Sequence, residues 1–377
     1  MAVYLDYNAS APIDGRVLDR MIEVYRSHYG NADSRTHVFG TEAKEIVSAS
    51  RRTIADSLGV DPTEVFFTSG STESNNMAVL GLLDHALESG RTHFITTAIE
   101  HKSVLEAMKH LQKKGCTVDF VPPDASGRVD AGRILERVTE KTLLVSMMHV
   151  NSETGVIQPI EEVGAALAGT GTYFHVDATQ GFGKRNDALR AAKYDMLSVT
   201  AHKLGGPQGV GAFVLRRDRS YKRPPVRPLM FGGPQERGYR PGTTPVALVA
   251  GFALAAELYD REAPEHMKRC AEIKARFLEA VKGLDYTLNG DQEHCLPSTV
   301  NVSFHGIDAE GIFLAVKEEY AFSNGSACTS GTHAPSYVLT AMGLDEDRVN
   351  EAVRISWDQS TEVDFSALVN YVKSMVD

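Results

Sequence analysis

The sequence predicts an α/β protein with a mainly parallel mixed sheet and a second, smaller α+β domain. Its 377 residues, 42% hydrophobic and 23% charged, are enough for two hydrophobic cores. Short apolar runs of β type alternate with helical stretches up to residue 215, as in sheets that helices cover on both faces. A long helix predicted over about 246–283 then leads to an alternating strand at 298–306. We therefore expect a large domain over 14–255 and a small domain formed by 1–13 and 256–377.

The N-terminal residues YLDYNASAP predict a short strand that runs into a turn. Pro12 prevents a helix before it, and Asp14 is expected to cap a helix over about 15–29. The Gly-, Asn- and Ser-rich stretch 30–40 is expected to be a loop that ends where Thr41 caps the next helix.

A glycine turn follows the buried strand VFFT at 65–68. The turn, Ser69-Gly70-Ser71, leads into a helix whose first residues include Thr72. Such a turn presents free backbone N–H groups and the positive end of a helix dipole, which suits a phosphate. By itself, an ordinary strand–helix connection has the same composition.

Several other predicted strands also end in polar groups. These residues, together with the two in the glycine turn, are Ser71, Thr72, His101, Asn151, Asp177, Gln180 and Lys203. Ligands of parallel sheets bind at the carboxyl ends of the strands. The sequence therefore predicts that these side chains converge on one site.

Asp177 and Lys203 indicate which ligand this site takes. They are 26 residues apart, about one strand–helix–strand unit, so they are expected to emerge side by side. A lysine that condenses with an aldehyde and a carboxylate that pairs with a pyridinium nitrogen suit pyridoxal 5'-phosphate (PLP). His101 is then expected either to lie on the face of the planar ring or merely to start a helix. The alternative is a buried Asp and a surface Lys in an ordinary α/β protein.

Two residues near the C-terminus have unusual surroundings. Cys328 lies in the small, polar stretch SNGSACTSG, whereas structural cysteines usually have apolar neighbours. We predict a nucleophilic cysteine in an exposed loop, and the alternative is a tolerated surface cysteine. Arg354 interrupts the β-type run AVRISW, as either an ion-pair partner or a clamp for a carboxylate.

Composition argues against several other classes of function. A net charge of −10 disfavours a general nucleic-acid or membrane-surface binder, and the basic, proline-rich 221–245 segment is expected to be an ordered connection across a dimer. No apolar run approaches the roughly 18 residues of a membrane span, and the N-terminus lacks a secretory signal. The four widely spaced cysteines form no CxxC pair, which predicts no metal site, no disulfide framework and a reducing cytoplasm.

At this level of detail the chain strongly resembles the PLP-dependent cysteine desulfurases, of the class V aminotransferase group and PLP fold type I. The resemblance is collinear over essentially the whole chain. Its motifs are YLDYNASAP, FTSGSTESNN, TAIEHKSVL, MHVNSETGVIQPI, HVDATQ, TAHKLGGPQGVGA, GGPQERGYRPGTTP, NVSF, NGSACTSG and VRIS. The SACTS-bearing stretch resembles the subgroup whose catalytic cysteine lies in a long, mobile loop.

The resemblance implies a role for each matching residue. Lys203 would bind the PLP aldehyde and move the substrate Cα proton. Asp177 would hold the pyridinium nitrogen, Gln180 the ring hydroxyl, and His101 would stack on the ring and assist proton transfer. The implied phosphate ligands are Ser71, Thr72, Thr200, His202 and, from the second subunit of a homodimer, Thr243. Asn151, also near the cofactor, and Arg354 would hold the substrate carboxylate, and Cys328 would accept the sulfur.

The implied activity is that of a sulfurtransferase: L-cysteine becomes L-alanine, and the sulfur passes to Cys328 as a persulfide for delivery to an acceptor protein. The chain stops soon after its last predicted helix, which leaves the pathway open among iron–sulfur cluster assembly, tRNA thiolation and DNA phosphorothioation. The alternatives are a selenocysteine lyase or another class V PLP enzyme, and a non-catalytic sulfur-relay scaffold. Neither membrane association nor direct nucleic-acid binding is expected.

Overall fold

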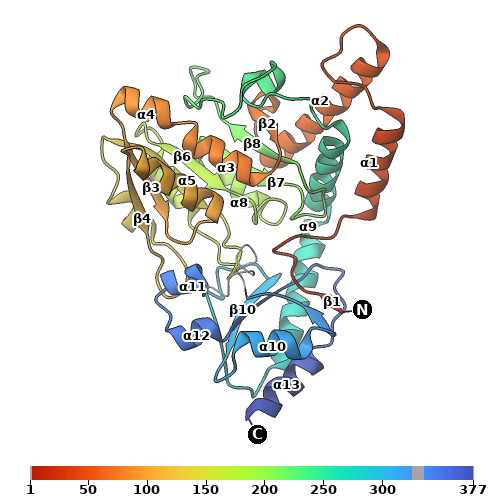
Figure 1. Cartoon of the computed structure of the whole chain (residues 1–377), viewed down its shortest axis with the longest axis vertical. Coiled ribbons are helices and arrows are strands. Elements are labelled where there is room, and N and C mark those ends of the chain that lie inside the picture. The colour runs from red at the N-terminus through yellow and green to blue at the C-terminus, as the bar shows by residue number, and fades with distance from the viewer. Residues whose placement is uncertain (1, 325–334, 377) are drawn as a thin grey trace.

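The computed structural model describes residues 2–324 and 335–376. The chain forms two lobes, and the long helix α9 (Val246–Ala280) runs through both of them (Figure 1). None of the described helices is long and apolar enough to cross a membrane.

The larger lobe is built on a sheet of seven strands in the order β2-β8-β7-β6-β5-β3-β4. Only β8 pairs antiparallel with its neighbours, so the other six strands share one direction. The mainly parallel mixed sheet predicted from the apolar runs is confirmed. The strands are β2 (Val65–Thr68), β3 (His93–Thr97), β4 (Thr117–Val121), β5 (Thr142–Met148), β6 (Tyr173–Asp177), β7 (Met196–Thr200) and β8 (Gly211–Leu215).

Helices cover both faces of this sheet, as adjacent residues of β2 illustrate. Phe66 packs in a cluster with α3 (Ser71–Leu80), α4 (Leu83–Ser89) and α5 (Lys102–Lys113), because successive strand residues point to opposite faces. Phe67 packs in a second cluster on the other face. That cluster includes α1 (Gly15–Ser27), α2 (Val38–Leu58), α6 (Ala131–Leu135), α7 (Ile160–Leu167), α8 (Asn186–Ala191) and the first half of α9. Two short 3₁₀ helices, η1 (Pro62–Glu64) and η2 (Gln235–Gly238), lie at the edge of this lobe.

The smaller lobe has its own antiparallel sheet, β12-β10-β9, and a separate parallel pair, β1-β11. Its core joins the second half of α9 to Leu5 from the N-terminal segment and to Trp357 just after β12. The elements are β1 (Val3–Tyr4), β9 (Tyr286–Leu288), β10 (Thr299–Phe304), α10 (Ala309–Val316), β11 (Tyr320–Ala321), α11 (Tyr337–Ala341), α12 (Glu346–Asn350), β12 (Ala352–Ser356) and α13 (Ser366–Val376). The division of the chain at 255/256 falls within α9 and stays a prediction.

The first residues of α1 and α2 show whether the N-caps predicted from the sequence are right. Asp14 caps α1 as predicted, since its side chain accepts the Arg16 N–H at 2.8 Å. The predicted cap at Thr41 is wrong, because α2 already begins at Val38. A ring nitrogen of His37 accepts the Gly40 N–H at 3.1 Å, so a histidine takes the place that Ser, Thr, Asp or Asn usually fills.

Candidate active site

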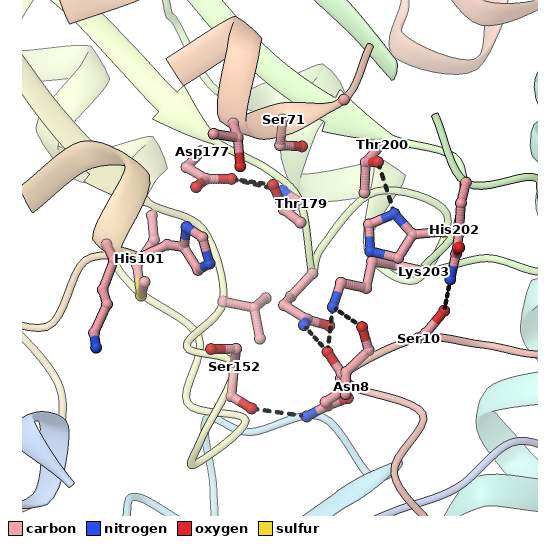
Figure 2. Close-up of a pocket in the computed structure, with 18 of the residues that line it drawn as sticks. Asn8, Ser10, Ser71, His101, Ser152, Asp177, Thr179, Thr200, His202 and Lys203 are labelled. Atoms are coloured by element: carbon pink, nitrogen blue, oxygen red, sulfur yellow. Dashed lines mark hydrogen bonds between the residues drawn. The ribbon is translucent and has the colours of Figure 1, made fainter. Parts of the chain in front are cut away.

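A cavity of about 530 Å³ opens at the carboxyl ends of the parallel strands. Its size is that of a typical cofactor or substrate site. Figure 2 shows side chains around one open space, with His101 at one side and Lys203 at the other. The predicted site residues that line it are Ser71, Thr72, His101, Asp177, Gln180, Thr200, His202, Lys203 and Arg354.

The glycine turn after β2 forms one end of the cavity. Gly70 has φ +147°, a conformation that side-chain-bearing residues rarely adopt, and it starts α3 without any side-chain cap. The helix therefore presents its first backbone N–H groups without a capping side chain. Ser71 Oγ is buried and has no hydrogen-bond partner among the described residues. This end has the donors and the helix dipole that bind a phosphate.

Thr200, the last residue of β7, and His202, in the turn after it, face the same end. Thr200 Oγ1 lies 3.0 Å from His202 Nδ1. Burial, with a contribution from the charge of Lys203, lowers the pKa of His202 to about 4. The imidazole is therefore neutral near pH 7 and supplies a hydrogen bond rather than a charge.

Asp177 ends β6 and is only 4% exposed. Its carboxylate accepts hydrogen bonds from Asn75 Nδ2 at 2.8 Å, from the Thr179 N–H at 3.0 Å and from the Thr179 hydroxyl. It makes no ion pair within the part of the chain that the structure describes. A buried carboxylate ordinarily needs a cationic partner, and a pyridinium N–H is one.

Burial raises the pKa of the neighbouring Glu100 to about 8, and the charge of Asp177 contributes to this shift. Glu100 is thus protonated near pH 7, which leaves Asp177 as the negative charge at this side of the cavity.

His101 is the N-cap of α5, four residues after the end of β3. Its Nδ1 accepts the Ser103 N–H at 3.1 Å and lies 2.8 Å from Ser103 Oγ. Since Nδ1 is an acceptor, Nε2 carries the proton in the neutral ring. Asn75 donates to Ser103 Oγ at 2.8 Å and also to Asp177, so one amide connects the two groups. Asn75 was not predicted as a site residue, because the only signal for it in the sequence is that of a polar residue one turn into a buried helix.

Lys203 follows β7, and β6 and β7 are parallel neighbours with Asp177 opposite Ser198. Asp177 and Lys203 thus lie at or just beyond the ends of adjacent parallel strands, and both line the cavity. Lys203 Nζ donates to the backbone oxygens of Asn8 and, at 2.7 Å, of Ala9. Gln180 Nε2 donates to the same Asn8 oxygen at 2.9 Å. Asn8 and Ala9 were not predicted to take part in the site.

Together these groups fit PLP. A phosphate would lie against Ser71, Thr72, Thr200 and His202, and the pyridinium N–H against Asp177, with Lys203 on the same wall for the aldehyde.

Arg354 lies in β12 and forms the far wall, where it is 2% exposed. One guanidinium nitrogen, Nη2, lies 2.5 Å from Asp6 Oδ1 and 2.9 Å from Ser323 Oγ. The other, Nη1, donates to the Ser152 backbone oxygen at 3.1 Å. Of the two predicted roles, the structure shows the ion pair, and the carboxylate clamp stays a prediction.

Three predicted residues are not among the described residues that line the cavity. Asn151 is buried beside it, where its Oδ1 accepts the N–H groups of Glu153 at 2.9 Å and Thr154 at 3.0 Å. Thr243 is exposed and lies just before α9. Cys328 lies outside the residues that the structure describes.

Two further residues on the cavity wall were missed. Glu153 is 2% exposed and accepts a hydrogen bond from Ser336 Oγ at 2.5 Å. Burial raises its pKa, an effect that Ser336 and then the charge of Arg354 partly oppose. The Tyr337 hydroxyl donates to the Glu100 backbone oxygen at 2.8 Å. Neither residue follows a large-sheet strand directly, so the strand-end pattern could not identify them.

Comparisons with known proteins agree with this geometry. Residues 3–363 match the family described as aminotransferase class-V. The cysteine desulfurase IscS of Rickettsia massiliae (strain Mtu5) is 39% identical, over 100% of this chain and 92% of that protein. A cysteine desulfurase of Pongo abelii is 40% identical, over 99% of this chain and 82% of that protein.

Solved structures give the same result. DndA from Streptomyces lividans superposes with a TM-score of 0.83 at 42% identity, over 93% of this chain and 98% of that chain. A NifS-like protein superposes with a TM-score of 0.90 at 36% identity, over 100% of this chain and 99% of that chain. SspA in complex with cysteine superposes with a TM-score of 0.83 at 34% identity, over 96% of this chain and 100% of that chain. This chain belongs to the class V aminotransferase family and, within it, to the PLP-dependent cysteine desulfurases.

Proposed function

We propose that this protein converts L-cysteine to L-alanine and transfers the sulfur to Cys328 as a persulfide. One observation carries the proposal. The residues on either side of the segment with Cys328 are bound to the wall of the PLP cavity: Ser323 contacts Arg354, and Ser336 contacts Glu153. The segment between them therefore starts and ends beside the substrate site.

The residues at the strand ends would hold the cofactor. Ser71, Thr72, Thr200 and His202 would bind the phosphate, Asp177 the pyridinium nitrogen and Gln180 the ring hydroxyl, and His101 would cover the ring. The chemistry that PLP supplies when bound is an electron sink for the substrate Cα–H bond. Asp177 would sustain that property by pairing with the pyridinium N–H.

Other side chains orient the substrate and move protons. Arg354 would bind the substrate carboxylate, and Asn151, proposed as its partner, already shapes the adjacent turn. Lys203 Nζ would take the Cα proton, because it lies on the same wall as Asp177, and His101 Nε2 would assist.

The sulfur step needs no external oxidant. The Cys328 thiolate attacks the substrate sulfur, an S–S bond forms and the substrate C–S bond breaks. The electron pair of that bond stays on the carbon, which is protonated to the methyl group of alanine. The products are L-alanine and the Cys328 persulfide, whose outer sulfur then passes to an acceptor protein.

Partners and location follow from the same proposal. We propose a homodimer in which Thr243 of one subunit completes the phosphate site of the other, and Thr243 is exposed as that requires. The acceptor serves iron–sulfur cluster assembly, tRNA thiolation or DNA phosphorothioation, in the cytoplasm. The proposal includes no membrane and no direct nucleic-acid contact.

Single-turnover release of alanine and sulfide from L-cysteine tests this function. We expect the wild type to be yellow and to form one persulfide per active site. Cys328→Ala should stay yellow but form no persulfide, and Lys203→Ala should lose the covalently bound cofactor. Cys295→Ala is the matched cysteine control, because Cys295 is not among the described residues of the cavity wall.

The result that would contradict the proposal is sulfide release by Cys328→Ala at the wild-type rate. A lyase that releases its product directly, such as a selenocysteine lyase, would then explain the site better.

A further inference from the structure

The N-terminal stretch 6–9 contacts both walls of the cavity, although no role has been given to its side chains above. Asp6 binds Arg354, and the backbone oxygens of Asn8 and Ala9 bind Lys203. We infer that Asp6 is a positioning residue that holds the guanidinium of Arg354 ready for the substrate carboxylate. This inference rests on the proposed clamp role of Arg354.

Backbone pairing fixes Asp6 beside the strand that carries Arg354. Asp6 forms a parallel bridge with Ser356, two residues beyond Arg354 in the chain. The Ser356 N–H donates to the Leu5 oxygen at 2.8 Å, and Ser356 Oγ accepts the Asn8 N–H at 3.0 Å. Asp6 thus meets Arg354 from a rigid neighbouring segment and not from a loose loop.

Arg354 is held from its other edge as well. Its backbone N–H donates to the Ser323 oxygen at 2.7 Å, and its Nη2 contacts Ser323 Oγ at 2.9 Å. The Ser152 backbone oxygen accepts from both Arg354 Nη1 and Asn8 Nδ2, each at 3.1 Å. These contacts fix the plane of the guanidinium, which decides how a planar carboxylate can pair with it.

Electrostatics make Asp6 different from the neutral contacts. Arg354 is 2% exposed, and a guanidinium buried to this extent is stable only with a carboxylate beside it. Asp6 provides that carboxylate from outside the cavity wall, because it is not among the described residues that line the cavity whereas Arg354 is. The charge of Arg354 is therefore compensated from outside the cavity wall, so the guanidinium is already oriented when the substrate arrives.

The experiment measures binding of a carboxylate apart from turnover. L-alanine is titrated into the PLP-loaded protein and followed by the visible absorbance of the cofactor, with ethylamine, which has no carboxylate, as the parallel ligand. For Asp6→Asn we expect about five- to fiftyfold weaker L-alanine binding, the same factor in the KM for L-cysteine, and less than a threefold change in kcat and in ethylamine binding. Asp14→Asn is the matched control, since Asp14 forms an exposed pair with Arg16, and it should leave all four values unchanged.

A double-mutant cycle separates positioning from general damage. Arg354→Gln alone should weaken L-alanine binding. The double variant with Asp6→Asn should bind L-alanine no more weakly than Arg354→Gln does, because Asp6 acts through the guanidinium. Additive losses would overturn the inference, as would unchanged L-alanine binding in Asp6→Asn. If Arg354→Gln itself binds L-alanine normally, the clamp role in the proposed function fails first. Should Asp6→Asn not fold, Asp6→Glu is measured instead, with the same expected loss for L-alanine and none for ethylamine.

Discussion

The two ends of the cavity are built in different ways. The proposed phosphate end takes its residues from the start of α3, the end of β7 and the turn after β7, so each group lies within a few residues of a strand end. The carboxylate end joins Asp6 to Arg354, 348 residues away in the chain, with Ser323 and Ser152 from two further segments. Local patterns predict the first kind of site, and long-range pairing produces the second.

The two ends of the cavity also differ in how their charged groups are compensated. At the cofactor side, burial keeps His202 and Glu100 neutral near pH 7, which isolates the charge of Asp177 for the ligand. At the carboxylate side, a full guanidinium charge is compensated by Asp6 before any ligand binds. We therefore expect substitutions at the cofactor side to change turnover and cofactor binding, and those at the carboxylate side to change substrate binding.

The largest effect is expected at Asp177. Asp177→Asn keeps the size of the side chain but removes the charge that the pyridinium nitrogen needs, so kcat should fall about a hundred- to a thousandfold while the fold persists. Steady-state alanine production measures it. Asp119→Asn, on the edge strand β4, is the control and should change kcat less than twofold; an equal loss in both variants would refute the role of Asp177.

Glu100 provides a test by pH. Its folded-state pKa of about 8 lies above the unfolded value, so its stabilising contribution is complete below about pH 4.5 and is lost as pH rises to 8. Glu100→Gln cannot lose a proton. The free energy of unfolding of this variant relative to wild type should therefore improve by about 2–4 kcal/mol between pH 5 and pH 8. Urea unfolding of the cofactor-free protein at the two pH values measures it.

Glu106→Gln, an exposed substitution on α5, is the control and should show a difference below about 0.5 kcal/mol. A flat pH dependence for Glu100→Gln would mean that Glu100 is charged in the folded protein.

Gly70 tests the phosphate turn. Gly70→Ala places a side chain at φ +147°, which we expect to distort the turn and weaken PLP binding by about ten- to thirtyfold. Gly90→Ala also places a side chain at positive φ, +73° at the end of α4, where a Cβ meets nothing within 4 Å, and should leave PLP binding unchanged. Reconstitution of the cofactor-free protein with PLP distinguishes the two. Equal losses would show that strain alone, and not the phosphate, is responsible.

The smallest effect is expected at Ser103. Ser103→Ala removes the hydroxyl that joins His101 Nδ1 to Asn75, so kcat should fall about two- to tenfold with little change in KM. Ser89→Ala, at the end of α4, removes a hydroxyl that bonds only the backbone of its own helix and of Arg91 just beyond it, and it serves as the control. A larger effect on KM than on kcat would show that Ser103 acts in substrate binding and not in turnover.

Much of the cofactor side could be predicted because its signals are local. Strand runs that stop at a polar residue placed Asp177 beside Lys203, and the glycine turn placed Ser71 at a helix start. Asn75 was missed because a polar residue inside a helix has no signature until Ser103 and Asp177 pack around it. The Thr41 cap was wrong because the composition of a loop does not show that a histidine ring will start the helix first.

By itself, the sequence determined the parallel sheet, the convergence of polar strand ends and the chemical types at the cofactor site, since apolar periodicity and strand direction are properties of short segments. Only the tertiary structure decided that Arg354 pairs with Asp6, that Asn8 and Ala9 hold Lys203, and that Glu153 joins the wall. The physical reason is that these contacts depend on how the two ends of the chain pack against the large sheet. No spacing along the chain encodes which buried charge will find which partner.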